Sequence, residues 1–256
     1  MPAPDGPTTA TDSPAEILKL TSERMVRPPS GLLTCLLMLC AARTAAAPLD
    51  SLFMRKFFAL FVLFLAATGD SAEPPTVLVF GDSLSAGFGI DVDQSWTSLL
   101  QTRLQEQGYE HRVVNASISG ETTEGGAARI DSAVETFQPA LIILELGGND
   151  GLRGFPPSRM KENFGKIISS SKSSGAAVVV LGIRIPPNYG QRYTEQFEGV
   201  FREVAAEYDV PWIEFFMEGV ALNEELMQGD GIHPNAAAQP VLLDNAWPMI
   251  SDALAQ

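Results

Sequence analysis

Four short blocks of the sequence carry side chains suited to nucleophilic chemistry. They are Gly81 to Gly87 (GDSLSAG), Asn115 to Thr122 (NASISGET), Gly147 to Gly151 (GGNDG) and Asp230 to Asn235 (DGIHPN). A serine is a weak nucleophile unless a neighbouring base removes its proton, and the chain has two histidines. His111 opens a predicted strand, which favours a structural role, whereas His233 follows Asp230 by three residues in a loop. That spacing can place the carboxylate against Nδ1 and leave Nε2 free to act as a base.

Ser83 is the candidate nucleophile, because it follows a predicted strand and precedes a helix. Its N–H would point at a developing anion, as the N–H groups at helix N-termini do. The N–H groups of Ser83 and Gly120 and the Asn149 amide could together form a three-donor oxyanion hole. Plainer interpretations stay open: a helix-capping or phosphate-binding Ser83, two turn residues, and an Asp230 that caps a helix beside a surface His233.

The elements that must position these blocks alternate between strand and helix. We expect strands at 76–81, 111–116, 140–146, 176–183 and 210–215, and helices at 94–107, 122–137, 158–173, 193–208 and 236–254, the last interrupted by Pro240 and Pro248. Such alternation predicts an α/β fold, a three-layer α/β/α sandwich around a five-stranded parallel sheet, flavodoxin-like in form. Its ligand site should lie outside the carboxyl ends of the strands, where the blocks fall. The segment Gly81-x-Ser83-x-Ser85 lacks the last glycine of the G-x-S-x-G elbow, so the usual α/β-hydrolase arrangement is not supported.

A secretory signal peptide is predicted at residues 54–72. A basic start at Met54 to Lys56 precedes eleven apolar residues at 57–67, and small residues run on to Ala72. This is the pattern of a signal sequence, and its apolar core is too short to cross ~30 Å of hydrocarbon as a helix. A buried N-terminal helix is the alternative.

Residues 1–53 are predicted to be a disordered leader that results from an upstream mis-start, because they are rich in Pro, Thr, Ser and Ala without lasting periodicity. A second apolar stretch at 31–42 could be a signal core of its own, read from Met25. In either case we expect one domain at 73–256, in a periplasmic or secreted protein.

Composition excludes several classes of function. Residues 73–256 hold 11 of the 17 basic and 25 of the 31 acidic residues, so the net charge of −14 belongs to them. That balance argues against a nucleic-acid partner. Both cysteines, Cys35 and Cys40, precede residue 73, which excludes disulfides, cysteine catalysis and cysteine-bound metals in the domain. We expect no stable membrane span in the mature chain, and nothing in the sequence demands more than a monomer.

The four blocks, in their order, resemble the SGNH hydrolase (GDSL esterase) family. The residues that name the family fall on Ser83, Gly120, Asn149 and His233, and its triad aspartate falls on Asp230. Further stretches, namely 147–154 (GGNDGLRG), 183–190 (IRIPPNYG), 192–193 and 227–228, resemble the thioesterase I/lysophospholipase L1/arylesterase subgroup. The resemblance covers residues 76–250. It implies a periplasmic serine esterase or thioesterase that hydrolyses aryl esters, lysophospholipids or acyl thioesters through an acyl-Ser83 intermediate, without metal or cofactor.

Two loops that follow predicted strands could line an apolar groove for the acyl chain. They contribute Leu152 and Phe155, and Ile185, Pro186 and Tyr189. Ordinary loop packing explains the same residues equally well.

Two other functions remain possible from the residues. A metal-assisted phosphoesterase could use Asp82, Asn149, Asp230 and His233, whose side chains can bind a hard cation. A non-catalytic binding module on the same frame would tolerate a broken triad, whereas all five positions are filled here.

Overall fold

A computed structural model describes residues 73–255, which belong to one compact unit. Its centre is a five-stranded parallel sheet with the order β2-β1-β3-β4-β5. The strands are β1 (Thr76–Gly81), β2 (Arg112–Asn115), β3 (Pro139–Glu145), β4 (Ala177–Leu181) and β5 (Trp212–Ile213). This is the flavodoxin-like order, and the predicted fold class is confirmed. The predicted leader and signal peptide lie outside the described residues.

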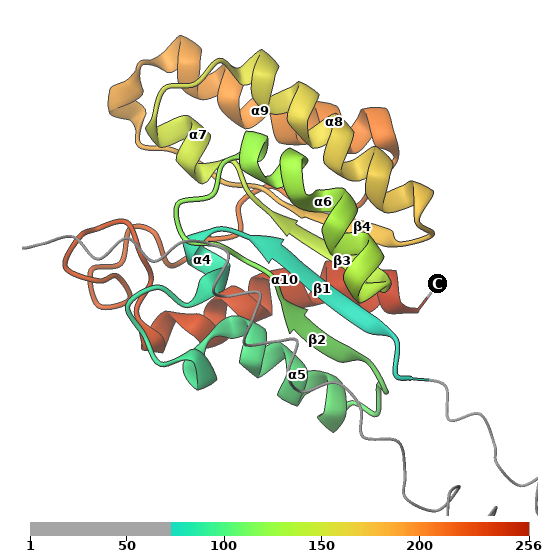
Figure 1. The fold of residues 1–256 in the computed structure, drawn as a ribbon. Helices are drawn as coiled ribbons and strands as arrows, with labels where there is room; N and C mark the ends of the chain where they lie inside the picture. Colours follow the sequence, from blue (N-terminus) through green and yellow to red (C-terminus); the bar gives the residue numbers. More distant parts are fainter. Residues whose placement is uncertain (1–72, 256) are drawn as a thin grey trace, which may run out of the picture. The chain divides into compact units, whose positions relative to one another are not determined.

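Helices cover both faces of the sheet (Figure 1). The long ones are α5 (Trp96–Glu106), α6 (Thr123–Phe137), α8 (Pro157–Ser173), α9 (Gln191–Tyr208) and α10 (Gln239–Leu254). The short ones are α4 (Ser83–Ala86), α7 (Gly148–Leu152), η2 (Val92–Gln94), η3 (Pro187–Tyr189) and η4 (Ala236–Ala238). Helices α5 and α10 pack on one face, and α6, α8 and α9 pack on the other. The three predicted layers are therefore present.

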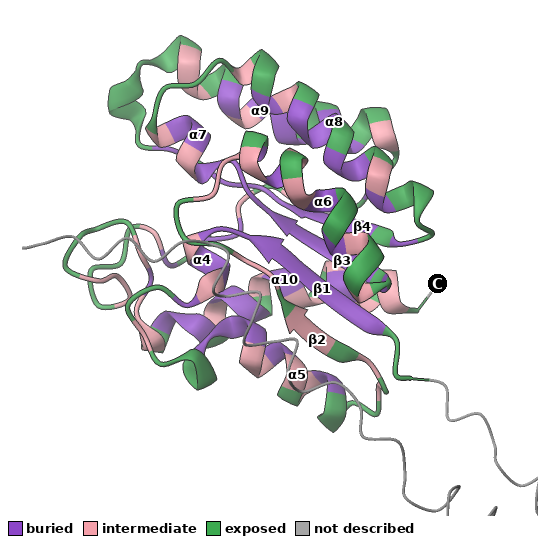
Figure 2. Ribbon diagram, in the orientation of Figure 1, coloured by how far each residue is buried: buried purple, intermediate pink, exposed green. Residues whose placement is uncertain are grey.

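The central strands are buried because helices cover them on both sides. Every residue of β1 is buried, and β3 and β4 are each exposed at a single position (Figure 2). Parallel strands in such a position are nearly continuous apolar runs, which the sequence has at 76–81, 140–146 and 176–183. The core holds the sheet rigid, so the loops at its carboxyl edge have a fixed base.

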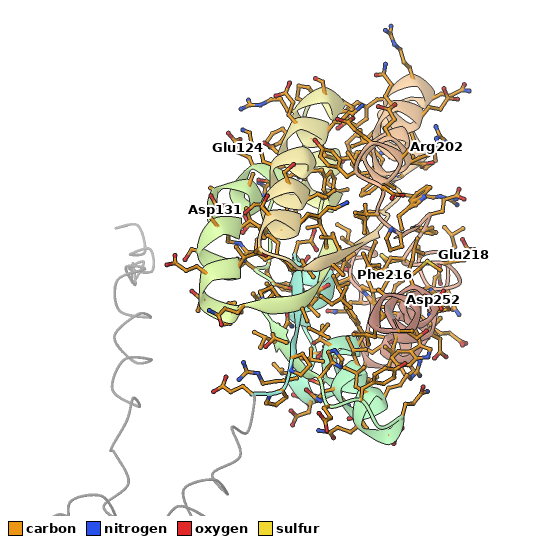
Figure 3. All side chains as sticks on the ribbon, turned by 90° about the vertical axis from the view of Figure 1, so that its right-hand side faces the viewer. Glu124, Asp131, Arg202, Phe216, Glu218 and Asp252 are labelled. Atoms are coloured by element: carbon orange, nitrogen blue, oxygen red, sulfur yellow. The ribbon has the colours of Figure 1, made fainter. Side chains whose placement is uncertain are left out.

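Helices α5 and α10 are joined although they lie at opposite ends of the domain sequence. The Trp96 N–H donates to Gln239 Oε1 at 2.9 Å, and the edge of the Trp96 ring packs on Phe216, with 5.4 Å between the ring centroids. Phe216 is fully buried inside the molecule, whereas Glu124 and Asp131 project from α6 into solvent (Figure 3). This packing brings the last part of the domain beside its first part.

The structure differs from the predicted elements in three respects. The fifth strand is only two residues long, and α10 continues through Pro248 instead of being interrupted. Pro240 sits in the first turn of α10, where a missing N–H costs no hydrogen bond. The short helices α4, α7 and η3 were not predicted, because three to five residues are too few for a period to be read. No helix within residues 73–255 has the length and hydropathy needed to span a bilayer.

Candidate active site

Ser83 lies at the carboxyl end of β1, as its position in the sequence predicts. Strand β1 ends at Gly81, Asp82 is the N-cap of α4, and Ser83 is the first helical residue. The Asp82 carboxylate accepts the Leu84 N–H at 3.1 Å through Oδ1, which fixes the turn. The hydroxyl of Ser83 is therefore held at the edge of a rigid sheet.

A chain of two hydrogen bonds joins Ser83, His233 and Asp230. Ser83 Oγ lies 2.9 Å from His233 Nε2, and His233 Nδ1 lies 2.7 Å from Asp230 Oδ2. The other carboxylate oxygen, Asp230 Oδ1, accepts the N–H groups of His233 at 3.0 Å and Ile232 at 2.9 Å. The structure thus brings together three side chains from the two ends of the domain.

The hydrogen bonds to Asp230 determine which imidazole nitrogen carries the proton. Donation by the backbone N–H and the ring of His233, and by the Ile232 N–H, lowers the pKa of Asp230 to about 2. Asp230 is therefore an anion at neutral pH and must accept a proton from Nδ1. We assign the neutral ring to the Nδ1–H tautomer, which directs the Nε2 lone pair at the Ser83 hydroxyl.

Asn235, and not Asp230, caps the helix that follows the loop of His233. Asn235 Oδ1 accepts the N–H groups of Ala237 at 2.9 Å and Ala238 at 3.3 Å, at the start of η4. The alternative interpretation of Asp230 as a helix cap is therefore wrong: its carboxylate faces the imidazole, and Asn235 caps the helix.

Gln228 connects the segment after Ser83 to the loop of His233. Its Nε2 donates to the Phe88 carbonyl at 2.7 Å and to the Pro234 carbonyl at 2.9 Å. Its own N–H donates to the His233 carbonyl at 2.7 Å. These bonds hold the two segments at a fixed separation, and with them the distance between hydroxyl and imidazole.

Gly120 lies in the loop after β2, which is attached to the end of β1. The Ile118 N–H donates to the Gly81 carbonyl at 3.0 Å, and Arg153 Nη2 donates to the Gly120 carbonyl at 3.0 Å. Gly120 has φ +79°, a conformation that favours glycine. Among the described residues, its N–H and that of Ser83 donate to no other group, so both remain available to a ligand.

Asn149 lies in α7, at the end of β3. Its Nδ2 donates to Asp82 Oδ2 at 3.0 Å, which uses one of the two amide protons and orients the other. Asp150, next to it, accepts the Thr123 N–H at 2.9 Å and so ties α7 to the start of α6. This agrees with a structural role for Asp150.

The five residues predicted to line an acyl groove lie in two loops that contact each other. The Tyr189 hydroxyl donates to the Leu152 carbonyl at 2.8 Å. Phe155, Pro186 and Tyr189 are exposed and Leu152 is partly buried, whereas Ile185 is buried in the core. Ile185 therefore cannot line an open surface in this conformation, and the other four remain predictions.

Three exposed apolar side chains in or next to the blocks that carry Ser83, Gly120 and His233 were missed in the sequence. Phe88 and Ile232 are about half exposed, as is Ile118, and the Phe88 ring centroid lies 4.4 Å from that of His233. The signal was present, since each large apolar residue stands next to or within a block of polar and small residues. A buried carboxyl pair, Asp82 and Glu145, was also missed as a feature of the site.

The side chains of the alternative metal site are already paired with each other. Asp230 binds His233, and Asp82 binds Asn149. Within residues 73–255, no three His, Cys, Asp or Glu side chains come together as metal ligands do. The geometry therefore favours the arrangement of a serine hydrolase.

The comparisons with known proteins agree with this geometry. The family model of the GDSL-like lipase/acylhydrolase family matches residues 79–240, which include all four blocks. The chain belongs to this family.

Relatives within the GDSL-like lipase/acylhydrolase family carry the names of esterases. Esterase TesA of Pseudomonas aeruginosa is 47% identical over 201 residues, which cover 78% of this chain and all of the relative. Thioesterase 1/protease 1/lysophospholipase L1 of Escherichia coli K12 is 43% identical over 184 residues, which cover 72% of this chain and 87% of the relative. A crystal structure of the psychrotrophic esterase EstA from Pseudoalteromonas sp., inhibited by monoethylphosphonate, has a TM-score of 0.68 at 38% identity and covers 71% of this chain and 99% of that one. The chain is a hydrolase of acyl esters and thioesters.

Proposed function

We propose that this hydrolase cleaves its substrates with Ser83 as nucleophile, His233 as general base and acid, and Asp230 as the residue that orients the imidazole. The observation that carries the proposal is the 2.9 Å hydrogen bond from Ser83 Oγ to His233 Nε2, continued by the 2.7 Å contact to Asp230. Nucleophile, base and orienting carboxylate within hydrogen-bond reach are the signature of an activated serine.

The first half of the reaction forms an acyl-enzyme. His233 Nε2 takes the hydroxyl proton while Ser83 Oγ bonds to the acyl carbonyl carbon, and the carbonyl electrons move onto oxygen. The oxyanion is stabilised by the N–H groups of Ser83 and Gly120 and by the second amide proton of Asn149. When the tetrahedral intermediate collapses, the C–O or C–S bond to the leaving group breaks, and that group receives the proton from His233.

The second half returns the enzyme to its starting state. His233 takes a proton from water, whose oxygen attacks the acyl carbon. Collapse of the second tetrahedral intermediate breaks the bond to Ser83 Oγ, which recovers its proton from the imidazolium. Throughout, the anionic Asp230 stabilises the imidazolium and holds its orientation.

Aryl esters, lysophospholipids and acyl thioesters are the proposed substrates. The exposed apolar residues Phe88, Ile118 and Ile232 offer contacts for an acyl chain beside the nucleophile. The test is a panel of kcat/KM values over p-nitrophenyl esters of increasing acyl length, a lysophospholipid and an acyl-CoA. We expect turnover of all three classes by the parent and none above background by Ser83→Ala.

Inhibition distinguishes this mechanism from metal-assisted phosphoester hydrolysis. We expect a serine-directed fluorophosphonate to abolish activity and to add its phosphonyl mass to the peptide that contains Ser83, while EDTA leaves activity intact. Loss of activity in EDTA with no labelling of Ser83 contradicts the proposal.

Residues 73–256 are proposed to form the hydrolase domain of a periplasmic or secreted protein that acts as a monomer. The support for export is the signal-peptide pattern at 54–72, and the support for one domain is the compact unit that includes residues 73–255. Cell fractionation with N-terminal sequencing of the mature protein tests the first point. Light scattering coupled to size exclusion tests whether the protein is a monomer.

Replacement of Asn149 by alanine is expected to lower kcat by ~10²–10³-fold, because one oxyanion donor is worth roughly 3 kcal/mol in the transition state. KM should change little, since the donor acts mainly on the developing charge. Asn245 provides the matched control: its amide donates to the Phe216 and Glu218 carbonyls, away from the site. Equal kcat values for Asn149→Ala and Asn245→Ala would remove Asn149 from the mechanism.

Activity is expected to fall as the pH is lowered from 8 to 5. A protonated imidazole cannot accept the Ser83 proton, so acid removes the base. Asp82 contributes to the same fall in activity at low pH, because burial raises its pKa to about 6. The pKa of Asp230 is too low to contribute. The measurement is kcat/KM against pH with a non-ionising ester, and a flat profile contradicts His233 as the base.

A further inference from the structure

Glu145, the last residue of β3, is a fully buried carboxyl group directly behind the site. It pairs in register with Gly81 of β1. A Cβ at position 81 would lie 2.8 Å from Glu145 Oε2, so the glycine leaves the space that the carboxyl group occupies. Glu145 Oε2 accepts the Ser85 hydroxyl at 2.8 Å and the Asp82 N–H at 3.3 Å. The mechanism above gives this group no role.

Asp82, whose N–H contacts the Glu145 carboxyl group, is also buried, with 2% of its surface exposed. Beyond the effect of burial, Asp82 raises the pKa of Glu145 and Glu145 lowers that of Asp82, as neighbouring carboxyl groups that share a proton do. Asp82 Oδ1 accepts the Leu84 N–H, and Oδ2 accepts Asn149 Nδ2 at 3.0 Å. Asp82 therefore lies between Glu145 and the proposed oxyanion donor Asn149.

Two carboxyl groups in contact inside a protein cannot both be ionised, so the pair must hold a proton. The hydrogen bonds indicate which group has it. Asp82 accepts two N–H donors, from Leu84 and Asn149, and both favour its anion. Glu145 Oε1, in contrast, is buried and receives no N–H or hydroxyl donor from the described residues. A protonated Oε1 that donates to Asp82 satisfies both groups.

We infer that Glu145 is held as a neutral carboxylic acid and, by donating to Asp82, positions the Asn149 amide for the oxyanion. The inference rests on the proposed role of Asn149. Burial and the neighbouring Asp82 raise the pKa of Glu145 well above its ordinary value, in agreement with this assignment. Glu145 does not touch the substrate, so it is a positioning residue: it fixes Asp82, and Asp82 fixes the amide.

The first test uses the dependence of stability on pH. If Glu145 takes up a proton on folding, the folded state binds one proton more than the unfolded state above pH ~4.3. As the pH rises, the folded state then loses stability, and Glu145 should increase the unfolding constant of the parent by up to about tenfold for each pH unit. Glu145→Gln is neutral at every pH, its amide can donate to Asp82, and its oxygen can accept from Ser85. The variant keeps Asp82 and His233, the other titratable groups of this cluster, so their contribution is present in both proteins.

We therefore expect the unfolding constant of the parent, divided by that of Glu145→Gln, to rise steeply between pH 5 and pH 8. Denaturant unfolding of the purified proteins, followed by tryptophan fluorescence, measures this ratio. Infrared difference spectra at pH 8 should also show a protonated carboxyl band in the parent that Glu145→Gln lacks. A ratio independent of pH, or absence of the band, means that Glu145 is ionised and overturns the inference.

The second test asks whether the donated proton matters for turnover. We expect Glu145→Gln to keep kcat within about threefold of the parent and Glu145→Ala to lose ~10–100-fold, since a small displacement of a catalytic group costs up to ~10²-fold. KM should stay nearly constant in both. Ile143→Ala, two residues earlier on the same face of β3 and equally buried, is the cavity control that should lose stability but keep kcat. Equal kcat for Glu145→Ala and the parent, or equal impairment of the Gln and Ala variants, contradicts a donating Glu145.

A double mutant shows whether Glu145 acts through Asn149. In the Asn149→Ala background, Glu145→Ala should cost little further kcat, because the amide that it positions is gone. Fully additive losses overturn this route. Ser83→Ala separates the two proposals: if it abolishes turnover while Glu145→Ala has no effect, only the inference fails. If Glu145→Ala does not fold, the pH-stability and infrared tests on Glu145→Gln still decide.

Discussion

Ser83→Ala is expected to lower kcat by ~10⁴–10⁶-fold, the range found when the nucleophile of a serine hydrolase is removed. The reason is geometric: Ser83 Oγ is the only part of the proposed machinery that bonds to the acyl carbon, and it already lies 2.9 Å from its base. The folded state should survive, because the variant removes one hydroxyl at the edge of the sheet. Steady-state turnover of a p-nitrophenyl ester, with circular dichroism as the folding check, measures the effect.

Two observations serve as controls for this variant. Ser170→Ala removes a partly buried hydroxyl on α8 that donates to Asp131, away from the triad, and should keep parental kcat. Fluorophosphonate labelling should disappear in Ser83→Ala and persist in Ser170→Ala. Near-normal esterase activity in Ser83→Ala ends the acyl-Ser83 mechanism, whichever substrate is used.

His233→Ala is expected to cost kcat a similar ~10⁴–10⁶-fold, because without the base the hydroxyl stays protonated and the leaving group gains no proton. The chain supplies its own matched control in His111, which lies just before β2. His111→Ala should retain parental turnover, since its ring contacts Tyr109 and not the triad.

The double variant adds a further check on His233. Ser83→Ala/His233→Ala should be no slower than Ser83→Ala alone, because residues that act as one unit are not additive. A second full loss in the double variant means that the two side chains act independently, which contradicts the shared proton transfer.

The sheet and its helices were predictable because their patterns are long. The apolar runs in β1, β3 and β4 and the amphipathic helices α6 and α9 extend over enough residues to show a period. Short elements were predicted less well. Strand β5 was predicted at 210–215 but has only two residues. Helices α4 and α7 are too short to show a period in the sequence, and they form where strands end.

The triad was predictable because each member stands in a block of distinctive spacing. The proposed oxyanion donors were found in the same way. Ile185 was assigned to an exposed groove, but it packs against Gly151 in the core, and sequence alone does not say which side of a loop faces inward. In the sequence, Glu145 is a single polar position in an apolar strand. Its meaning depends on Asp82, 63 residues away, and that pairing exists only after β1 and β3 align.

The contact between Trp96 and Gln239 has a consequence for how the enzyme becomes active. The proposed nucleophile belongs to the first strand and loop of the domain, while the proposed base stands just before α10, the last helix along the chain. A nascent or truncated polypeptide without that final segment has a hydroxyl but no imidazole within reach. On the proposed mechanism, ester cleavage therefore requires the complete domain.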